Sequence, residues 1–160
     1  MLKFRRSTSK EKALQLWLRG FSTIVRFLKL EYLHENQFVA GKPKLWLRLD
    51  GLTLFVATIV VFASLHEHWW IYPALLFVPD IFMVGYIKDS KFGAFLYNFG
   101  HSYFAPTITA FAGWAAKDSG VIAVGVIWLG HVGWDRFFGY GLKYDTRFKD
   151  THLGALDSQK

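Results

Sequence analysis

The segment VIAVGVIWLGHVGWDRFFGYGL, residues 121–142, decides the fold class. At a rise of 1.5 Å per residue, a helix of this length crosses a hydrocarbon core of about 30 Å. The segment nevertheless contains His131, Asp135 and Arg136. An ionisable side chain near the bilayer centre costs at least about 2.5 kcal/mol, so such residues face a bundle interior instead of lipid. The segment therefore predicts a membrane helix with one polar, inward-facing side.

Three more apolar segments precede this one and complete the predicted bundle. They cover about residues 45–65, 69–87 and 92–116. The polar turns between them are so short that successive helices must be antiparallel neighbours. We therefore expect an all-α, integral membrane four-helix bundle over residues 45–142, with the fourth helix at 121–142, followed by a cytoplasmic tail at 143–160.

The N-terminal region, residues 1–44, differs from the bundle because it is basic and polar overall. Within it, apolar and basic side chains of residues 10–33 separate onto two sides of a helix at 100° per residue. This pattern predicts a basic amphipathic helix that lies in the membrane interface. Packing on the protein's own surface is the alternative.

Charge distribution predicts both the partner and the orientation of the chain. Hydrophobic residues make up 52% of the 160 residues, yet the net charge is +7. The basic residues flank apolar segments and do not line one soluble face, so we expect anionic lipid headgroups as partner and no nucleic acid. All Lys and Arg except Lys117 fall on the side of the two termini or at its boundary. The positive-inside rule then predicts a multi-pass protein of the cell membrane with both termini cytoplasmic.

Several polar residues of the apolar segments are expected at one depth. Helical rise places Asp80 and His131 about 16 Å from the outer boundary and His101 about 15 Å from the inner boundary, which is one common depth, with Asn98 and Asp135 just on the cytoplasmic side. His131 and Asp135 are four residues apart, and Asn98 and His101 are three apart, so each pair shares a helix face. Three helices are therefore expected to aim these side chains into one site.

The residue types at this site indicate a metal centre. Imidazoles and carboxylates bind divalent zinc, manganese or iron, and a metal ion offsets the desolvation of the aspartates. We therefore predict His101, His131, Asp80 and Asp135 as metal ligands, with Asp135 and Asp80 as catalytic groups that act on bound water. The alternative is a buried polar network that only ties helices together. Residues predicted to surround the ligands or bind substrate are Asn98, Arg136, Tyr140, Lys143 and His152.

The order of motifs resembles a known membrane family. LRLDGLTLF (47–55), VPDIFMVGYI (78–87), YNFGHSY (97–103), LGHVGWDRFFGYGLKY (129–144) and FKDTHLG (148–154) resemble the family called domain of unknown function 4260, over about residues 45–155. This resemblance implies four membrane helices and no established activity.

A looser resemblance is to the membrane-bound metal-dependent hydrolases. It rests on three pairs, Pro79 with Asp80, His101 with Ser102, and His131 with Asp135. Phe82 stands where that family has a second acidic residue, and no His-Arg pair precedes Gly100. One or two metal ligands of that family therefore have no counterpart here.

Two classes of function remain open from the sequence. The first is a metal-dependent hydrolase acting on a lipid or lipid-linked phosphate at the cytoplasmic leaflet, with Arg136 or Lys143 holding the anionic group. The second is a non-enzymatic ion or proton carrier, or a structural membrane protein, that uses the same polar network. A carrier would require a homo-oligomer, because four helices without internal repeats make a thin pathway. The turn HEH, residues 66–68, lacks the spacing of a metal motif and is read as a solvated outer turn.

Overall fold

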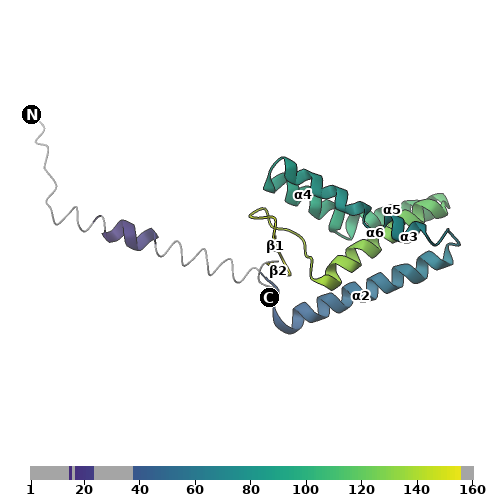
Figure 1. Cartoon of the computed structure of the whole chain (residues 1–160), viewed down its shortest axis with the longest axis horizontal. Helices are drawn as coiled ribbons and strands as arrows, with labels where there is room; N and C mark the ends of the chain where they lie inside the picture. The colour runs from purple at the N-terminus through teal and green to yellow at the C-terminus, as the bar shows by residue number, and fades with distance from the viewer. Residues whose placement is uncertain (1–14, 16, 24–37, 156–160) are drawn as a thin grey trace, which may run out of the picture. The chain divides into compact units, whose positions relative to one another are not determined.

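The computed structural model describes residue 15 and residues 17–23 and 38–155 (Figure 1). The chain divides into two units, Met1–Gln37 and Phe38–Lys160. In the first unit residues 17–23 are helical, and the rings of Trp17 and Phe21 stack with their centroids 5.5 Å apart. The rest of the amphipathic helix expected over 10–33 lies outside the described residues. The second unit carries the fold and the candidate site.

The second unit is a set of helices followed by one small hairpin, which confirms the all-α fold class. The elements are α2 (Gly41–Ser64), α3 (Ile71–Leu75), the 3-10 helix η1 (Val78–Ile87), α4 (Ser90–His101), α5 (Phe104–Ala116), α6 (Ser119–Phe138), β1 (Asp150–Thr151) and β2 (Gly154–Ala155). The two strands pair antiparallel.

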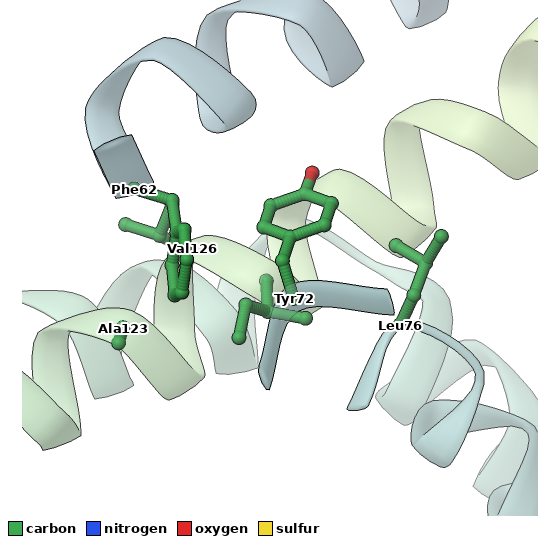
Figure 2. Close-up of a cluster of buried hydrophobic side chains, with 6 residues drawn as sticks. Phe62, Tyr72, Leu76, Ala123 and Val126 are labelled. Carbon is green, nitrogen blue, oxygen red and sulfur yellow. The ribbon is translucent and has the colours of Figure 1, made fainter. Parts of the chain in front are cut away.

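Helix α6 lies at the centre of this unit. Both α2 and α5 pack along it, and η1 packs against α4 (Figure 1). The main apolar core joins α2, α3 and α6 (Figure 2). Its buried side chains are Phe62, Tyr72, Leu76, Ala123, Val126 and Ile127. Because α6 contacts elements on several sides, half of its residues are buried, whereas most residues of α2 are not.

Two of the helices, α2 and α6, are long and apolar enough to cross a membrane. Many large apolar side chains on the outside of this unit are exposed, among them Val60 on α2 and Phe111 on α5. Exposure of such side chains to water is unfavourable, whereas contact with lipid tails is not. Length and composition thus suggest a membrane protein; the multi-pass topology and the cytoplasmic termini stay predictions.

Helices α4 and α6 begin at aspartates of the short polar turns. The carboxylate of Asp89 accepts a hydrogen bond from the backbone N–H of Phe92 at 2.8 Å. Asp118 does the same for Val121 at 3.0 Å. These side chains satisfy N–H groups that a helix start leaves without partners. The aspartates of the turns KDSK (88–91) and KDSG (117–120) therefore serve as helix caps.

The second and third apolar segments differ from the continuous helices expected over 69–87 and 92–116. The second divides into α3 and η1, and the third into α4 and α5. Each break has a proline four residues further on: Pro79 follows Leu75, and Pro106 follows Ser102. A proline offers no N–H to the carbonyl four residues earlier, and its ring would clash with that carbonyl in a continuous helix. Both breaks lie beside the polar residues Asp80 and His101.

Helices α2 and α6 approach each other backbone to backbone at two glycines. A Cβ atom on Gly51 would lie 2.6 Å from Cβ of Arg136 and 2.7 Å from the carbonyl oxygen of Gly133. A Cβ atom on Gly133 would lie 2.8 Å from the carbonyl oxygen of Gly51. The contact therefore needs glycine on both helices, as in other close helix pairs of membranes.

Replacing Gly51 by alanine is expected to lower the free energy of unfolding by about 1 to 3 kcal/mol, because the helices must separate or shift. Thermal unfolding of the detergent-solubilised protein would measure the loss. Gly120→Ala is the matched control, because a Cβ there would meet only the Asp118 side chain, at 3.3 Å. Equal stability of the two variants would contradict the close contact.

Candidate metal centre

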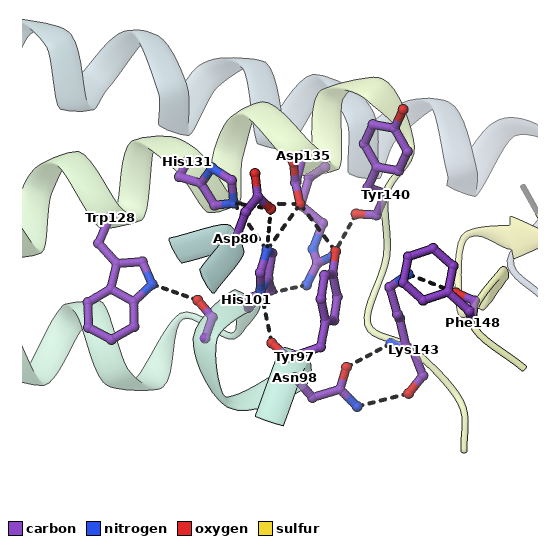
Figure 3. A network of polar contacts seen from close by, with 12 residues as sticks. Asp80, Tyr97, Asn98, His101, Trp128, His131, Asp135, Tyr140, Lys143 and Phe148 are labelled. Atoms are coloured by element: carbon purple, nitrogen blue, oxygen red, sulfur yellow. Dashed lines mark hydrogen bonds and ion pairs between the residues drawn. The ribbon is translucent and has the colours of Figure 1, made fainter. Parts of the chain in front are cut away.

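Four polar side chains from three elements meet inside the unit (Figure 3). Asp80 comes from η1, His101 is the last residue of α4, and His131 and Asp135 come from α6. Both imidazoles are fully buried, whereas the Asp80 side chain is 36% exposed. The structure thus brings together the four residues that the sequence proposes as metal ligands.

The two imidazoles face each other through the same ring atom. Nε2 of His101 lies 3.1 Å from Nε2 of His131. Oδ1 of Asp80 lies 3.3 Å from the first of these nitrogens and 3.6 Å from the second. Ligand atoms bound to one tetrahedral zinc ion are separated by about 3.4 Å. These three atoms are therefore spaced like three corners of a tetrahedral metal site.

Asp135 lies slightly further from the imidazoles. Its Oδ2 atom is 3.6 Å from Nε2 of His101 and 3.9 Å from Nε2 of His131. The hydroxyl of Tyr97 donates a hydrogen bond to the same oxygen at 3.2 Å. Asp135 can thus bind the metal as a fourth ligand or accept a proton from water next to it.

Tyr97 and its backbone fix the orientation of His101. Nδ1 of His101 donates a hydrogen bond to the carbonyl of Tyr97 at 2.9 Å. The two rings also stack, with centroids 3.7 Å apart and an interplanar angle of 13°. With the proton held at Nδ1, a neutral His101 presents a lone pair at Nε2, as metal-binding histidines do.

Unlike Nδ1 of His101, Nδ1 of His131 has no well-aligned hydrogen-bond partner among the described residues. This atom is buried, although the carbonyl of Leu76 interacts with the ring. A hydrogen bond between the two Nε2 atoms would need the proton of neutral His131 at Nε2, which leaves Nδ1 a buried acceptor without a donor. A metal ion removes this cost, because the proton can then stay at Nδ1 toward Leu76.

The end of α4 is held by two side chains of α6. The helix leaves its last carbonyls without helical partners. Nε1 of Trp128 donates to the carbonyl of Gly100 at 2.6 Å, and Nη2 of Arg136 donates to the carbonyl of His101 at 3.1 Å. Nη1 of Arg136 donates to the carbonyl of Tyr140 at 2.8 Å. The helix that carries His131 thus also fixes the backbone of His101, and Arg136 acts as a clamp between backbone segments.

The tail folds back against the bundle and two predicted site residues hold it there. The side-chain amide of Asn98 donates to the carbonyl of Lys143 at 2.8 Å and accepts from its N–H at 2.7 Å. Nδ1 of His152 accepts from the N–H of Leu142 at 2.8 Å. Both side chains therefore anchor the tail and are not directed at the imidazoles.

Lys143 is buried in a cage of aromatic rings. Its Nζ lies 3.4 Å from the ring centroid of Phe148 and 4.7 Å from that of Tyr97. The ammonium group donates one hydrogen bond, to the carbonyl of Phe148 at 2.7 Å. Burial lowers the pKa of Lys143 to about 8, against the opposing effect of the Asp135 and Asp80 charges.

A cavity of about 290 Å³ connects these groups. Its lining includes the charged residues Asp80, Asp135 and Lys143 and the aromatic residues Trp134 and Tyr140. Tyr140 therefore lies at the candidate site, although the residue is 44% exposed. The cavity gives a small molecule or headgroup access to the carboxylates.

Sequence reasoning missed two residues that build the site. Tyr97 stacks on His101 and binds Asp135, and Trp128 holds the end of α4. Tyr97 precedes His101 by four residues and Trp128 precedes His131 by three, so helical spacing already places both beside the histidines. The outer-turn residue Glu67 takes no part in the site, since its carboxylate accepts from the hydroxyl of Ser119 at 2.7 Å.

Comparison with known proteins identifies the family of this chain. The family model described as "Domain of unknown function (DUF4260)" matches residues 44–156, which include every residue of the site. The chain therefore belongs to this family. No curated protein and no solved structure matches the chain.

Packing of the tail requires His152 in its neutral form, so the stability of this packing depends on pH. Burial lowers the pKa of His152, because the charged ring would be desolvated and would lie near Arg136. The unfolded chain, with an ordinary histidine pKa of about 6.5, binds the proton first. The contribution of His152 is therefore complete above about pH 6.5 and is lost as pH falls through and below it.

We expect His152→Asn, which retains an acceptor for Leu142 but does not titrate, to lose stability less steeply than the wild type between about pH 7 and 5. Unfolding in detergent across that range would measure the slopes. His68→Asn, at an exposed turn position, should keep the wild-type slope. A wild-type slope in His152→Asn would show that His152 does not couple folding to protons.

Proposed function

We propose that this chain is a metal-dependent membrane hydrolase that acts on a lipid or lipid-linked phosphate ester. One divalent ion, zinc, manganese or iron, would be bound by His101, His131 and Asp80. Asp135 would accept a proton from the reacting water. The cavity lined by Asp80, Asp135 and Lys143 would admit the phosphate group from the cytoplasmic leaflet.

The observation that carries this proposal is the pair of buried Nε2 atoms 3.1 Å apart. Tyr97 fixes the His101 proton at Nδ1, and Nδ1 of His131 makes no hydrogen bond of good geometry within the described residues. If His131 also carries its proton at Nδ1, the two Nε2 lone pairs face each other and repel unless a cation lies between them; if it carries the proton at Nε2, its buried Nδ1 is left an acceptor without a donor. Asp80, at 3.3 and 3.6 Å, supplies the anionic ligand that zinc, manganese or iron binds well.

The reaction requires only water and the ester. A bound divalent ion lowers the pKa of water and polarises a phosphoryl oxygen. Asp135 takes one proton as the water oxygen forms its bond to phosphorus. The P–O ester bond breaks with its electron pair on the departing oxygen, and Asp135 returns the proton to that oxygen. The products are a phosphate and an alcohol, so neither an oxidant nor a reductant is needed.

A lipid substrate is supported by the surroundings of the site. Helices α2 and α6 are long and apolar enough to lie in a bilayer. The cavity beside the carboxylates is bordered by Phe77, Trp134 and Phe148 as well as by polar groups. A lipid-linked phosphate combines an anionic group with an apolar part, and this mixed lining suits both.

Metal analysis of the purified protein tests the proposal. We expect about one tightly bound divalent ion per chain, and its loss in His101→Ala and His131→Ala. His68→Ala should retain it, because His68 lies in the exposed outer turn. Cobalt substitution offers a second readout, since visible absorption bands report a tetrahedral site without any activity assay.

An assay of ester hydrolysis distinguishes the catalytic role of Asp135 from a role in metal binding. Asp135→Asn should keep the metal but slow the release of phosphate or alcohol from lipid phosphate esters by about 10²- to 10⁴-fold, the usual contribution of a general base. Wild-type protein without stoichiometric metal, together with an unaffected His131→Ala variant, would overturn the proposal. Proton movement into liposomes by the metal-free wild type would support a carrier instead.

A further inference from the structure

Lys143 carries a buried positive charge that no carboxylate balances directly. Its residue is 7% exposed, and within the described ranges no carboxylate oxygen lies within 4.0 Å of Nζ. One of its three N–H groups is used, by the carbonyl of Phe148. A buried charge without an ionic partner is costly. The ammonium group therefore retains donors for an anion.

The position of Lys143 places these donors at the candidate metal centre. Lys143 lines the same cavity as Asp80 and Asp135, and Figure 3 shows these three residues in one polar network. The backbone of Lys143 is pinned to Asn98 by two hydrogen bonds, and its side chain is held among the rings of Phe148 and Tyr97. The cation is therefore fixed in place before any ligand enters, which reduces the entropy lost on binding.

Counting the charges around the cavity shows why an anion is needed there. Of the residues that line it, Asp80 and Asp135 contribute two negative charges and Lys143 contributes one positive charge, and Arg136 is a further buried cation outside the lining. A divalent ion between the histidines would add two more positive charges. Nη1 and Nη2 of Arg136 each donate to a backbone carbonyl, and Arg136 does not line the cavity, so Lys143 is the cation placed to contact an incoming anion.

The separation of the two positive centres favours a phosphate group over a carboxylate. Lys143 forms no ion pair with Asp80 or Asp135, so a ligand that contacted both the ammonium group and a metal held by His101, His131 and Asp80 would have to reach across part of the cavity. A phosphate presents oxygens in several directions and can contact both at once, whereas the two oxygens of a carboxylate lie in one plane. Lysine binds phosphate as a point charge and places few demands on geometry.

We propose that Lys143 is the phosphate-binding residue of this cavity and holds the phosphate of the substrate between its ammonium group and the metal centre. This inference rests on the proposed hydrolase function for the identity of the second contact. It assigns the phosphate contact to Lys143 alone and excludes Arg136, which the sequence left as an equal candidate.

Binding of inorganic phosphate and of phosphatidic acid tests the assignment. Titration calorimetry on the full chain would use inorganic phosphate in detergent, and phosphatidic acid in phosphatidylcholine nanodiscs. Lys143→Met, which keeps an unbranched apolar stem among the rings, should bind either probe about 10- to 100-fold more weakly, the usual effect of losing a charge-assisted hydrogen bond. Lys143→Arg should recover most of the affinity. Tighter binding of phosphatidic acid identifies a lipid headgroup, and equal affinity for both probes identifies a free phosphate ester.

Lys88→Met is the matched control, because Lys88 is also a lysine over an aromatic ring, that of Phe92 at 4.9 Å, but lies outside the cavity. It should bind both probes like the wild type. Equal affinity of Lys143→Met and the wild type, in a variant that still unfolds at the wild-type temperature, would overturn the assignment. So would equal losses in Lys143→Met and Lys88→Met, which would indicate a general surface charge effect.

The same titrations distinguish failure of this inference from failure of the proposed function. If the protein binds no metal but phosphate binding still depends on Lys143, the anion site stands and the hydrolase does not. If metal binding depends on His131 but Lys143→Met binds phosphate as tightly as the wild type, the metal centre is supported and this inference is wrong.

Discussion

The close approach of two buried imidazole nitrogens is the constraint on which the rest of the site depends. Nε2 of His101 and Nε2 of His131 lie 3.1 Å apart in a region without water access to either ring. Such a contact is stable only if a proton or a metal ion lies between the two atoms. The hydrogen bond of His101 to Tyr97 and the lack of a good partner for Nδ1 of His131 among the described residues favour the metal.

The broken helices give this pair its position. Proline interrupts the second and third apolar segments, so α4 ends at His101 and η1 begins next to Asp80. The carbonyls freed at the end of α4 are then bound by Trp128 and Arg136 of α6. Irregular backbone inside a membrane protein is tolerated where neighbouring side chains satisfy it in this way. The break therefore orients a ligand and links α4 to α6 at the same point.

The sequence predicts the convergence of the site better than the form of its helices. Helical rise places Asp80, His101 and His131 at one depth, and the spacing of His131 with Asp135 puts the second aspartate on the same helix face just to the cytoplasmic side. The same reasoning predicted continuous helices over 69–87 and 92–116, because periodicity alone does not show where backbone hydrogen bonds go. It also left Asn98, Arg136 and His152 as candidate site residues, although their donors and acceptors serve the backbone. Those partners lie far away in the chain and follow only from the folded tail.

The direct test of a metal between the histidines is X-ray absorption at the metal edge of the purified, metal-loaded protein. A site built from His101, His131 and Asp80 should show two imidazole nitrogens and at least one oxygen at about 2.0 to 2.2 Å from the ion. His131→Ala should remove one imidazole from the spectrum or the ion altogether. A first shell made only of oxygen atoms, or a spectrum that His131→Ala leaves unchanged, would contradict the metal centre and leave the two histidines as a hydrogen-bonded pair.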